Sequence, residues 1–202
     1  MLDYEVLKFE DFEADKTIVI IIYMYNGFAK AGNLYSPRVE KLIDPIVNLA
    51  EKAISSSISV LAYTDYHSED AKEFSAYPAH CIANTVESEL VDSLKALISV
   101  GLIVKHKNST NGLLAYNPAQ SMIGIAHYIV VGCVTDICVY QYATTLRAYL
   151  NEHNLEGEVI VSKAHMDTYD IPDVHDGDLF QQMAITSMAM NGIKVVNDII
   201  LQ

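Results

Sequence analysis

The segment that most constrains the fold of this 202-residue chain is residues 17–24, Thr-Ile-Val-Ile-Ile-Ile-Tyr-Met. It is rich in β-branched residues and shows no alternation of polar and apolar positions. A strand with one face in water alternates, whereas a strand in a parallel sheet is covered by helices on both faces and stays apolar throughout. The segment therefore predicts a central strand of a parallel sheet.

Strand-like and helix-like segments alternate along the rest of the chain. Helix starts are indicated at Ser36, where Pro37 follows a serine N-cap, at Thr85 or Ser88, and at Cys138. Further strands are expected at residues 58–64, 102–104, 128–131, 159–161 and 193–196. This pattern predicts an α/β, three-layer fold, a parallel sheet of about six strands with helices on both faces. The length suits a single domain over residues 1–202.

The charge and the apolar content exclude several classes of protein. The chain has 26 acidic and 13 basic residues, a net charge of -13, so phosphate backbones and acidic lipids should be repelled. Its longest apolar run, residues 18–24, is far shorter than the roughly 20 residues of a membrane span. The acidic N-terminus is unlike a secretory signal, and three cysteines do not suggest a disulfide framework. We expect a cytoplasmic protein with neither nucleic acid nor a membrane as partner.

Ligands of parallel sheets bind beyond the carboxyl ends of the strands, so the segments after each expected strand are informative. Cys138 follows the strand at residues 128–131 and lies near the start of a helix. Backbone N–H groups there favour a thiolate and can hold an oxyanion, which makes Cys138 a candidate nucleophile. Taken alone, a cysteine in such a position is more often a buried core residue, and Cys133 is interpreted that way.

A lysine-containing segment follows the strand at residues 102–104. Lys105 or Lys107 could approach the thiol and lower its pKa. A solvent-exposed loop lysine is the commoner alternative.

A set of potential metal ligands follows the strand at residues 58–64. Asp65 and His67 are two apart, so in an extended chain their side chains point the same way. With His80, and Glu73 as a further donor, they form a candidate site for zinc, manganese or iron. A hydrogen-bonded Asp–His pair without a metal is the alternative interpretation.

In combination, these segments resemble the isochorismatase-like cysteine hydrolase family, and most closely its nicotinamidase branch. The family's nucleophile segment, a glycine followed by Thr-Asp-x-Cys-Val, is matched by Gly132 and residues 135–139. Its lysine segment is matched by residues 107–112. Its metal segment, Asp-x-His and then Pro-x-His-Cys, is matched by residues 65–67 and 78–81. The resemblance runs in order from about residue 18 to residue 196.

The resemblance implies a reaction and the residues that perform it. Cys138 would attack a small carboxamide and release ammonia through an acyl-enzyme, with Lys107 rather than Lys105 in the catalytic place. Backbone N–H groups from Val134 and Thr135 to Cys138 would stabilise the oxyanion, and the family's cis peptide would join Val134 to Thr135.

The resemblance also implies the ligands and partners of the chain. Asp65, His67 and His80 would hold a divalent metal, which in nicotinamidases binds the pyridine nitrogen of the substrate. Phe28 would lie in the substrate pocket. No organic cofactor is implied, and a homo-oligomer is expected.

One position departs from the family pattern. The family has a catalytic aspartate at the end of the first strand, then two intervening residues, then Asn or Gln, and Phe one or two places further on. Here Tyr23 stands in the place of the aspartate. Proton transfer by such a group typically accelerates a reaction about 100- to 10,000-fold. A phenol is a poor base at neutral pH unless a cation such as Lys107 lowers its pKa. Two hypotheses therefore stand: an amide hydrolase with an altered triad, or a catalytically impaired homologue with a ligand-binding or structural role.

Overall fold

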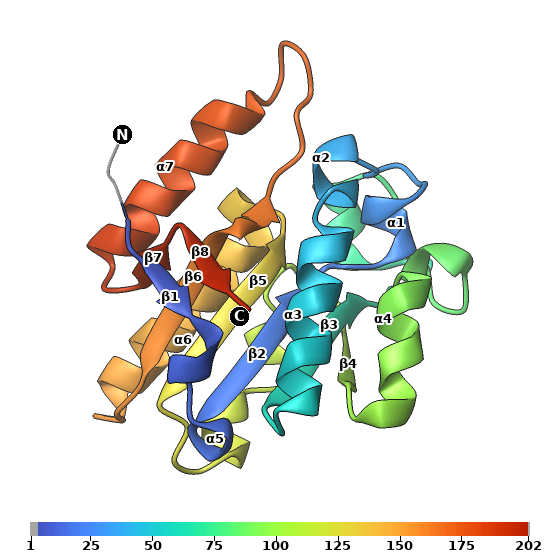
Figure 1. The fold of residues 1–202 in the computed structure, drawn as a ribbon. Coiled ribbons are helices and arrows are strands. Elements are labelled where there is room, and N and C mark those ends of the chain that lie inside the picture. The colour runs from blue at the N-terminus through green and yellow to red at the C-terminus, as the bar shows by residue number, and fades with distance from the viewer. Residues whose placement is uncertain (1–3, 202) are drawn as a thin grey trace.

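A computed structural model describes residues 4–201 and shows a parallel sheet between two layers of helices (Figure 1). In this part of the chain the main sheet has six strands in the order β4-β3-β2-β5-β6-β7, all paired in parallel. The α/β three-layer fold predicted from the sequence is confirmed. The predicted domain of residues 1–202 also includes residues 1–3 and 202, which lie outside the described residues.

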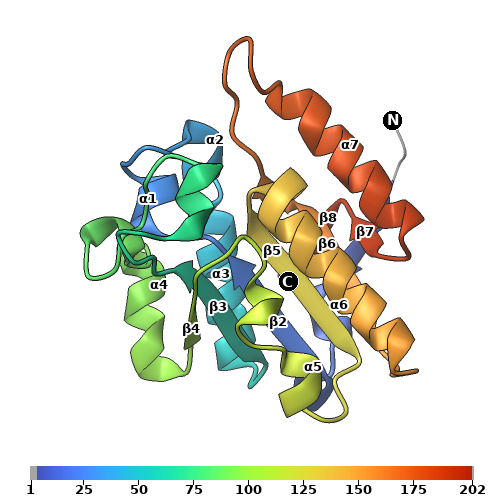
Figure 2. The same cartoon turned by 180° about the vertical axis from the view of Figure 1, so that it is seen from behind.

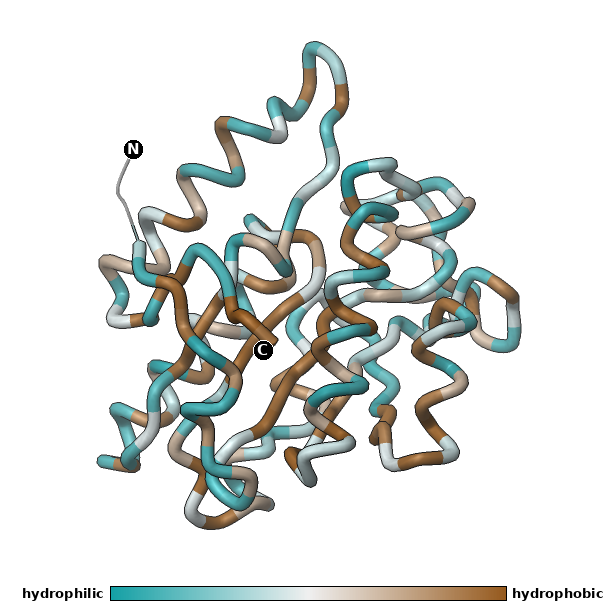
Figure 3. Tube along the Cα trace, in the orientation of Figure 1, coloured by the Kyte–Doolittle hydropathy of each residue, from teal (hydrophilic) through white to brown (hydrophobic). Residues whose placement is uncertain are grey.

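The apolar segment that began the sequence argument forms β2 (Thr17–Ile22), inside the sheet and buried at every position. Figure 3 shows apolar residues gathered along the central strands. Most strands fall where they were expected, but several run further toward their carboxyl ends. The other strands of the sheet are β3 (Ser59–Asp65), β4 (Ile103–Lys107), β5 (His127–Cys133), β6 (Glu158–Asp167) and β7 (Lys194–Val196).

The long helices cover opposite faces of the sheet. Helix α3 (Ile43–Ser55) packs with α4 (Asp92–Ala96), and it lies in front of the sheet in Figure 1. Helix α6 (Tyr140–Glu152) packs with α7 (Gly177–Met190), and it lies in front when the molecule is seen from behind (Figure 2). These two layers confirm the predicted helices on both faces of the sheet.

Two helix predictions need correction. Ser36 caps a helix as predicted, since its hydroxyl accepts from the Arg38 N–H at 3.3 Å, but that helix is the short α2 (Pro37–Glu40), which ends before α3 begins. Neither Thr85 nor Ser88 caps α4, because the Ser88 hydroxyl donates to Thr85 O at 2.8 Å within a 3₁₀ turn instead. After α4 the chain tightens into another 3₁₀ turn, which changes the facing of its side chains and leaves Ile98 48% exposed.

Some elements were not predicted. A separate parallel pair joins β1 (Val6–Lys8) to β8 (Asp198–Ile200). Two short helices, α1 (Asn26–Ala29) and α5 (Pro118–Ser121), lie in connecting segments. Within residues 4–201 no helix combines the length and apolarity that crossing a membrane requires.

The register of the sheet brings the predicted site residues together. Asp65 is the strand partner of Lys107, and Ile22, directly before Tyr23, is the partner of Gly132. A Cβ on Gly132, whose φ is +117°, would lie 1.9 Å from Ile22 O, so only glycine allows β2 and β5 to approach this closely. The residues that follow β2, β3, β4 and β5 therefore meet at one edge of the sheet.

Candidate active site

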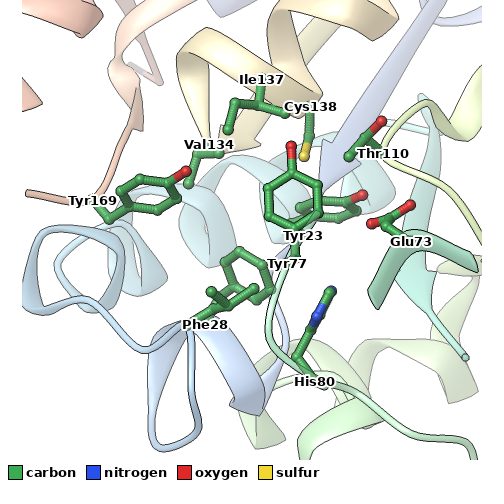
Figure 4. A pocket seen from close by; sticks show the side chains of 11 residues that line it. Tyr23, Phe28, Glu73, Tyr77, His80, Thr110, Val134, Ile137, Cys138 and Tyr169 are labelled. Atoms are coloured by element: carbon green, nitrogen blue, oxygen red, sulfur yellow. The ribbon is translucent and has the colours of Figure 1, made fainter. Parts of the chain in front are cut away.

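Cys138 lies in a single π-helical turn, Thr135–Val139, between β5 and α6. Its side chain is 3% exposed and lines a cavity of about 20 Å³, which has room for about one water molecule (Figure 4). Phe28, predicted for the substrate pocket, lines the same cavity. The thiol is thus placed at the carboxyl ends of the strands, in a small, partly open cavity.

The predicted cis peptide is one bond out of place. It joins Cys133 to Val134, not Val134 to Thr135, because β5 continues to Cys133 and the turn begins at the next peptide bond. Val134 lines the cavity, whereas Thr135 is fully buried and its hydroxyl has no hydrogen-bond partner among the described residues. The N–H groups of Ile137 and Val139 both donate to Val134 O at 3.2 Å. An oxyanion role for the N–H groups of Val134, Thr135 and Cys138 stays a prediction.

The expected thiolate at Cys138 is not supported. Burial raises the pKa of the Cys138 thiol to about 12, although Lys107 and the Tyr23 hydroxyl act in the opposite direction. The helix-start argument failed because desolvation of the buried thiol outweighs the effect of the nearby positive charge. Cys138 is therefore a protonated thiol at neutral pH.

Tyr23 follows β2 directly and is 1% exposed. Its φ of +59° is uncommon for a large side chain. The hydroxyl accepts a hydrogen bond from Lys107 Nζ, donates to Ser109 O at 3.3 Å and interacts with the Cys138 thiol. Burial first, and then Cys138 and Asp65, raise the pKa of Tyr23 well above its usual value, so the nearby lysine does not make it a phenolate.

Lys107, not Lys105, reaches the thiol region, as the resemblance implied. Lys107 is 4% exposed, and its Nζ donates to Asp65 Oδ1, to the Tyr23 hydroxyl and to Ser109 O, the last at 2.7 Å. Lys105 instead places its Nζ 4.6 Å from the centre of the Tyr116 ring. The buried ammonium therefore has its carboxylate partner on β3.

The four predicted metal donors form one cluster, Asp65, His67, Glu73 and His80, with ligand atoms all within 4.8 Å of one another. Asp65 Oδ2 lies 3.5 Å from Nε2 of both His67 and His80, and Glu73 Oε1 lies 3.9 Å from His67 Nε2. Donor atoms bound at about 2.1 Å to a tetrahedral zinc ion are about 3.4 Å apart. The spacing of the cluster therefore fits a divalent metal.

Hydrogen bonds turn both imidazoles toward the centre of this cluster. His67 Nδ1 donates to Asn108 Oδ1 and His80 Nδ1 donates to Pro78 O, each at 2.8 Å. Metal-binding histidines commonly donate their second ring nitrogen in this way. His67 Nε2 is buried and has no hydrogen-bond partner among the described residues. The 3.5 Å separation from Asp65 is long for a simple hydrogen-bonded Asp–His pair, so the metal interpretation fits better.

The charge of the cluster centres on Asp65, which is fully buried. Tyr25 donates its hydroxyl to Asp65 Oδ2 at 2.5 Å, while Lys107 occupies Oδ1. Burial would raise the pKa of Asp65, but Lys107 and the two histidines hold it well below its usual range. Burial and the Asp65 charge raise the pKa of Glu73. Asp65 is thus an ionised carboxylate shared between the lysine and the metal-type donors.

Sequence reasoning missed several residues around the site. Asn108, which orients His67, lies in the lysine segment that the resemblance had already marked. Tyr25 and Tyr169 carried no signal, because only the packed structure brings the first to Asp65 and the second to the cavity wall.

Comparison with known proteins agrees with this fold. The family model of the isochorismatase domain matches residues 17–197. Nicotinamidase 1 of Arabidopsis thaliana is 27% identical over 209 residues, which cover 90% of this chain and 85% of that protein.

Solved structures share the fold at lower identity. The yeast nicotinamidase superposes with a TM-score of 0.75 at 16% identity, covering 90% of this chain and 99% of that one. The pyrazinamidase of Pyrococcus horikoshii in complex with zinc superposes with a TM-score of 0.67 at 20% identity, covering 90% of this chain and 99% of that one. The N-carbamoylsarcosine amidase of Thermoplasma acidophilum superposes with a TM-score of 0.69 at 22% identity, covering 90% of this chain and 96% of that one.

The fold and the site define an α/β protein with a buried thiol beside a lysine and a metal-type donor cluster. Because the domain model spans nearly the whole described chain, this protein belongs to the isochorismatase family.

Proposed function

We propose that this protein is an amide hydrolase of the nicotinamidase type, with Cys138 as nucleophile and a small planar carboxamide as substrate. The observation that carries the proposal is the Tyr23 hydroxyl, which contacts both Lys107 Nζ and the Cys138 thiol. Similarity to proteins named as nicotinamidases and amidases supports the reaction class.

In this mechanism the thiol and the phenol act together. Cys138 sulfur bonds to the carbonyl carbon as its proton passes to the Tyr23 oxygen, and the Tyr23 proton passes to the amide nitrogen. The carbon–nitrogen bond breaks, ammonia leaves, and water then cleaves the thioester to give the carboxylate and the free thiol. Lys107 stabilises negative charge that develops on the sulfur, since its ammonium already lowers the pKa of Cys138 against the effect of burial. Because the proton passes from the thiol to the phenol as the phenol gives its own proton to the amide, Tyr23 does not have to be ionised beforehand.

The donor cluster supplies the second part of the proposed site. Asp65, His67 and His80, with Glu73 beside them, would hold zinc, manganese or iron. When bound, the ion supplies a Lewis acid that accepts a ring nitrogen. These residues would position that ion, since Asn108 and Pro78 O fix the orientation of both imidazoles.

The test is ammonia release from nicotinamide, pyrazinamide and a panel of small carboxamides. We expect release by the unmodified protein and none by Cys138→Ala. Cys133→Ala, at a second buried thiol, is the matched control and should retain activity. Equal signals from the unmodified protein and Cys138→Ala would refute the proposal.

A second candidate is a catalytically impaired homologue that binds a ligand without turnover. The observation in its favour is that burial keeps both Cys138 and Tyr23 protonated at neutral pH, so the residue in the place of the family aspartate is not an ionised base. Tyr23→Asp should then create amide hydrolysis that the unmodified protein lacks. A Tyr23→Asp protein as inactive as its parent would show that the tyrosine is not the cause.

The homo-oligomer, the cytoplasmic location and the absence of nucleic-acid and membrane partners remain predictions. So do the identity of the metal and the lack of an organic cofactor. Size-exclusion chromatography with light scattering tests the first, and metal analysis of the purified protein tests the identity of the ion.

A further inference from the structure

The loop between β6 and α7, residues 168–176, is named the strap here, and it rises beyond the carboxyl ends of the strands (Figure 1). The turn Thr135–Val139, which carries Cys138, is called the nucleophile turn here. Asp136, a residue of this turn, connects the strap to it. Its Oδ1 accepts a hydrogen bond from the Thr168 hydroxyl at 2.5 Å, and its Oδ2 lies 2.8 Å from His175 Nε2. We call these three side chains the Asp136 clasp.

The clasp lies directly behind one wall of the Cys138 cavity. His175 is only 8% exposed, and its ring stacks on Phe180 with centroids 4.1 Å apart. The ring of Tyr169 lies 4.5 Å from the same imidazole, and Tyr169 lines the cavity (Figure 4). The imidazole therefore links the carboxylate of the nucleophile turn to a side chain of the cavity wall.

Arg38 anchors both ends of the strap, independently of the clasp. Arg38 binds Asp167 Oδ1 at 2.8 Å before the strap and Asp178 Oδ1 at 2.7 Å after it. Within the strap, Ile171 and His175 exchange backbone hydrogen bonds of 2.9 and 2.8 Å. The strap is thus a closed unit with fixed ends, and the clasp binds Thr168 and His175, close to those two ends, to Asp136.

Access to the thiol requires one wall of the cavity to move. The cavity of about 20 Å³ holds about one water molecule, so a carboxamide with several heavy atoms cannot enter it as it stands. Tyr169 is the wall residue that belongs to the strap, and release of the clasp would let it move while Arg38 keeps both ends in place.

We propose that His175 is a positioning residue which, through Asp136, holds Tyr169 closed over the cavity and so sets the size of molecule that reaches Cys138. A role of His175 in selecting substrates by size rests on the proposed function. Access to the thiol does not depend on turnover, and it can be measured by itself.

The experiment compares two reagents with the same chemistry and different sizes, methyl and benzyl methanethiosulfonate. The measured quantity is the ratio of their modification rates at Cys138, followed by mass spectrometry of the cysteine peptides. A change in thiol pKa affects both rates alike and cancels in the ratio. We expect His175→Ala to raise the benzyl-to-methyl ratio about tenfold or more, since it removes a hydrogen bond to a charged group.

His175→Gln places an amide nitrogen the same number of bonds from Cβ and should restore the ratio. Val174→Ala, at the exposed tip of the strap, is the matched control and should leave the ratio unchanged. Thr168→Val, which breaks the other hydrogen bond of the clasp with little change in shape, should also raise it. It provides an independent test if His175→Ala does not fold.

Cys81 and Cys133, both buried, report general opening of the fold. An unchanged ratio in both His175→Ala and Thr168→Val, a parallel increase at all three thiols, or failure of His175→Gln to restore the ratio would overturn the proposal. Absence of amide hydrolysis would count against the proposed function and leave these ratios unaffected, so the two ideas fail separately.

Discussion

The neighbouring strands β2 and β3 end in different chemistry at the same edge of the sheet. After β2 comes Tyr23, a buried phenol in the place where the resemblance implies an aspartate, whereas β3 ends in Asp65, a buried carboxylate. Both contact the ammonium of Lys107. The carboxylate that balances the buried lysine therefore lies on β3, and loss of the acid at position 23 leaves the lysine paired.

The largest effect is expected from Asp65→Asn. Removing one partner of a buried ion pair leaves an uncompensated charge, so we expect a loss of about 3–5 kcal/mol in the free energy of unfolding. Urea unfolding measures it. Glu73→Gln removes a carboxylate from the same cluster without breaking an ion pair to Lys107, and should cost less than about 1 kcal/mol. Equal losses in the two variants would show that Asp65 does not balance the lysine.

The pH dependence of stability sharpens the same point. The pKa of Asp65 is lower in the folded protein than in the unfolded chain, so its contribution is present above the unfolded value of about 3.9 and is lost as pH falls below it. Asp65→Asn should therefore flatten the loss of stability in acid. An acid limb as steep as that of the unmodified protein would contradict the assignment.

Zinc binding is the next effect in size. With free zinc at about 100 times its dissociation constant, a metal that binds only the folded state should stabilise the protein by about 2.7 kcal/mol. We expect a rise in melting temperature that a chelator reverses and that His67→Asn removes, because His67 Nε2 faces the centre of the cluster. His106→Asn, at an exposed histidine on the adjacent strand β4, is the control and should keep the shift. A shift lost equally in both variants would place the metal elsewhere.

Two hydroxyl deletions compare the contacts of Lys107 and Asp65 most directly. Tyr25→Phe removes a donor to the Asp65 carboxylate and should cost about 1.5–3 kcal/mol, as hydrogen bonds to charged groups do. Tyr23→Phe should cost only about 1 kcal/mol. The smaller loss is expected because Lys107 keeps Asp65 and Ser109 O, and its Nζ lies 3.6 Å from the centre of the Tyr23 ring. If Tyr23→Phe lowered the free energy of chemical unfolding more than Tyr25→Phe does, the hydroxyl that donates to Asp65 would be the less important of the two.

The same contrast explains what the sequence could predict. The run at residues 17–24 identified the central strand because both of its faces are buried, and the motif spacings located Cys138, Lys107 and the donor cluster because they all follow strand ends. The pairing of Asp65 with Lys107 depends on the register of β3 against β4, which no local pattern encodes. The raised pKa of Cys138 depends on how completely the packed side chains around the thiol exclude water from it, which no local pattern encodes either.

The smallest effect should come from Lys95→Ala. Lys95 Nζ lies 2.6 Å from Glu89 Oε2, but the two side chains are 50% and 48% exposed. Water already stabilises both charges there, and ordering two flexible side chains costs conformational entropy, so such pairs add little to stability. The midpoint of urea unfolding should stay within measurement error of the unmodified protein. A loss comparable to that of Asp65→Asn would mean that proximity alone, rather than burial, gives the Lys107 pair its importance.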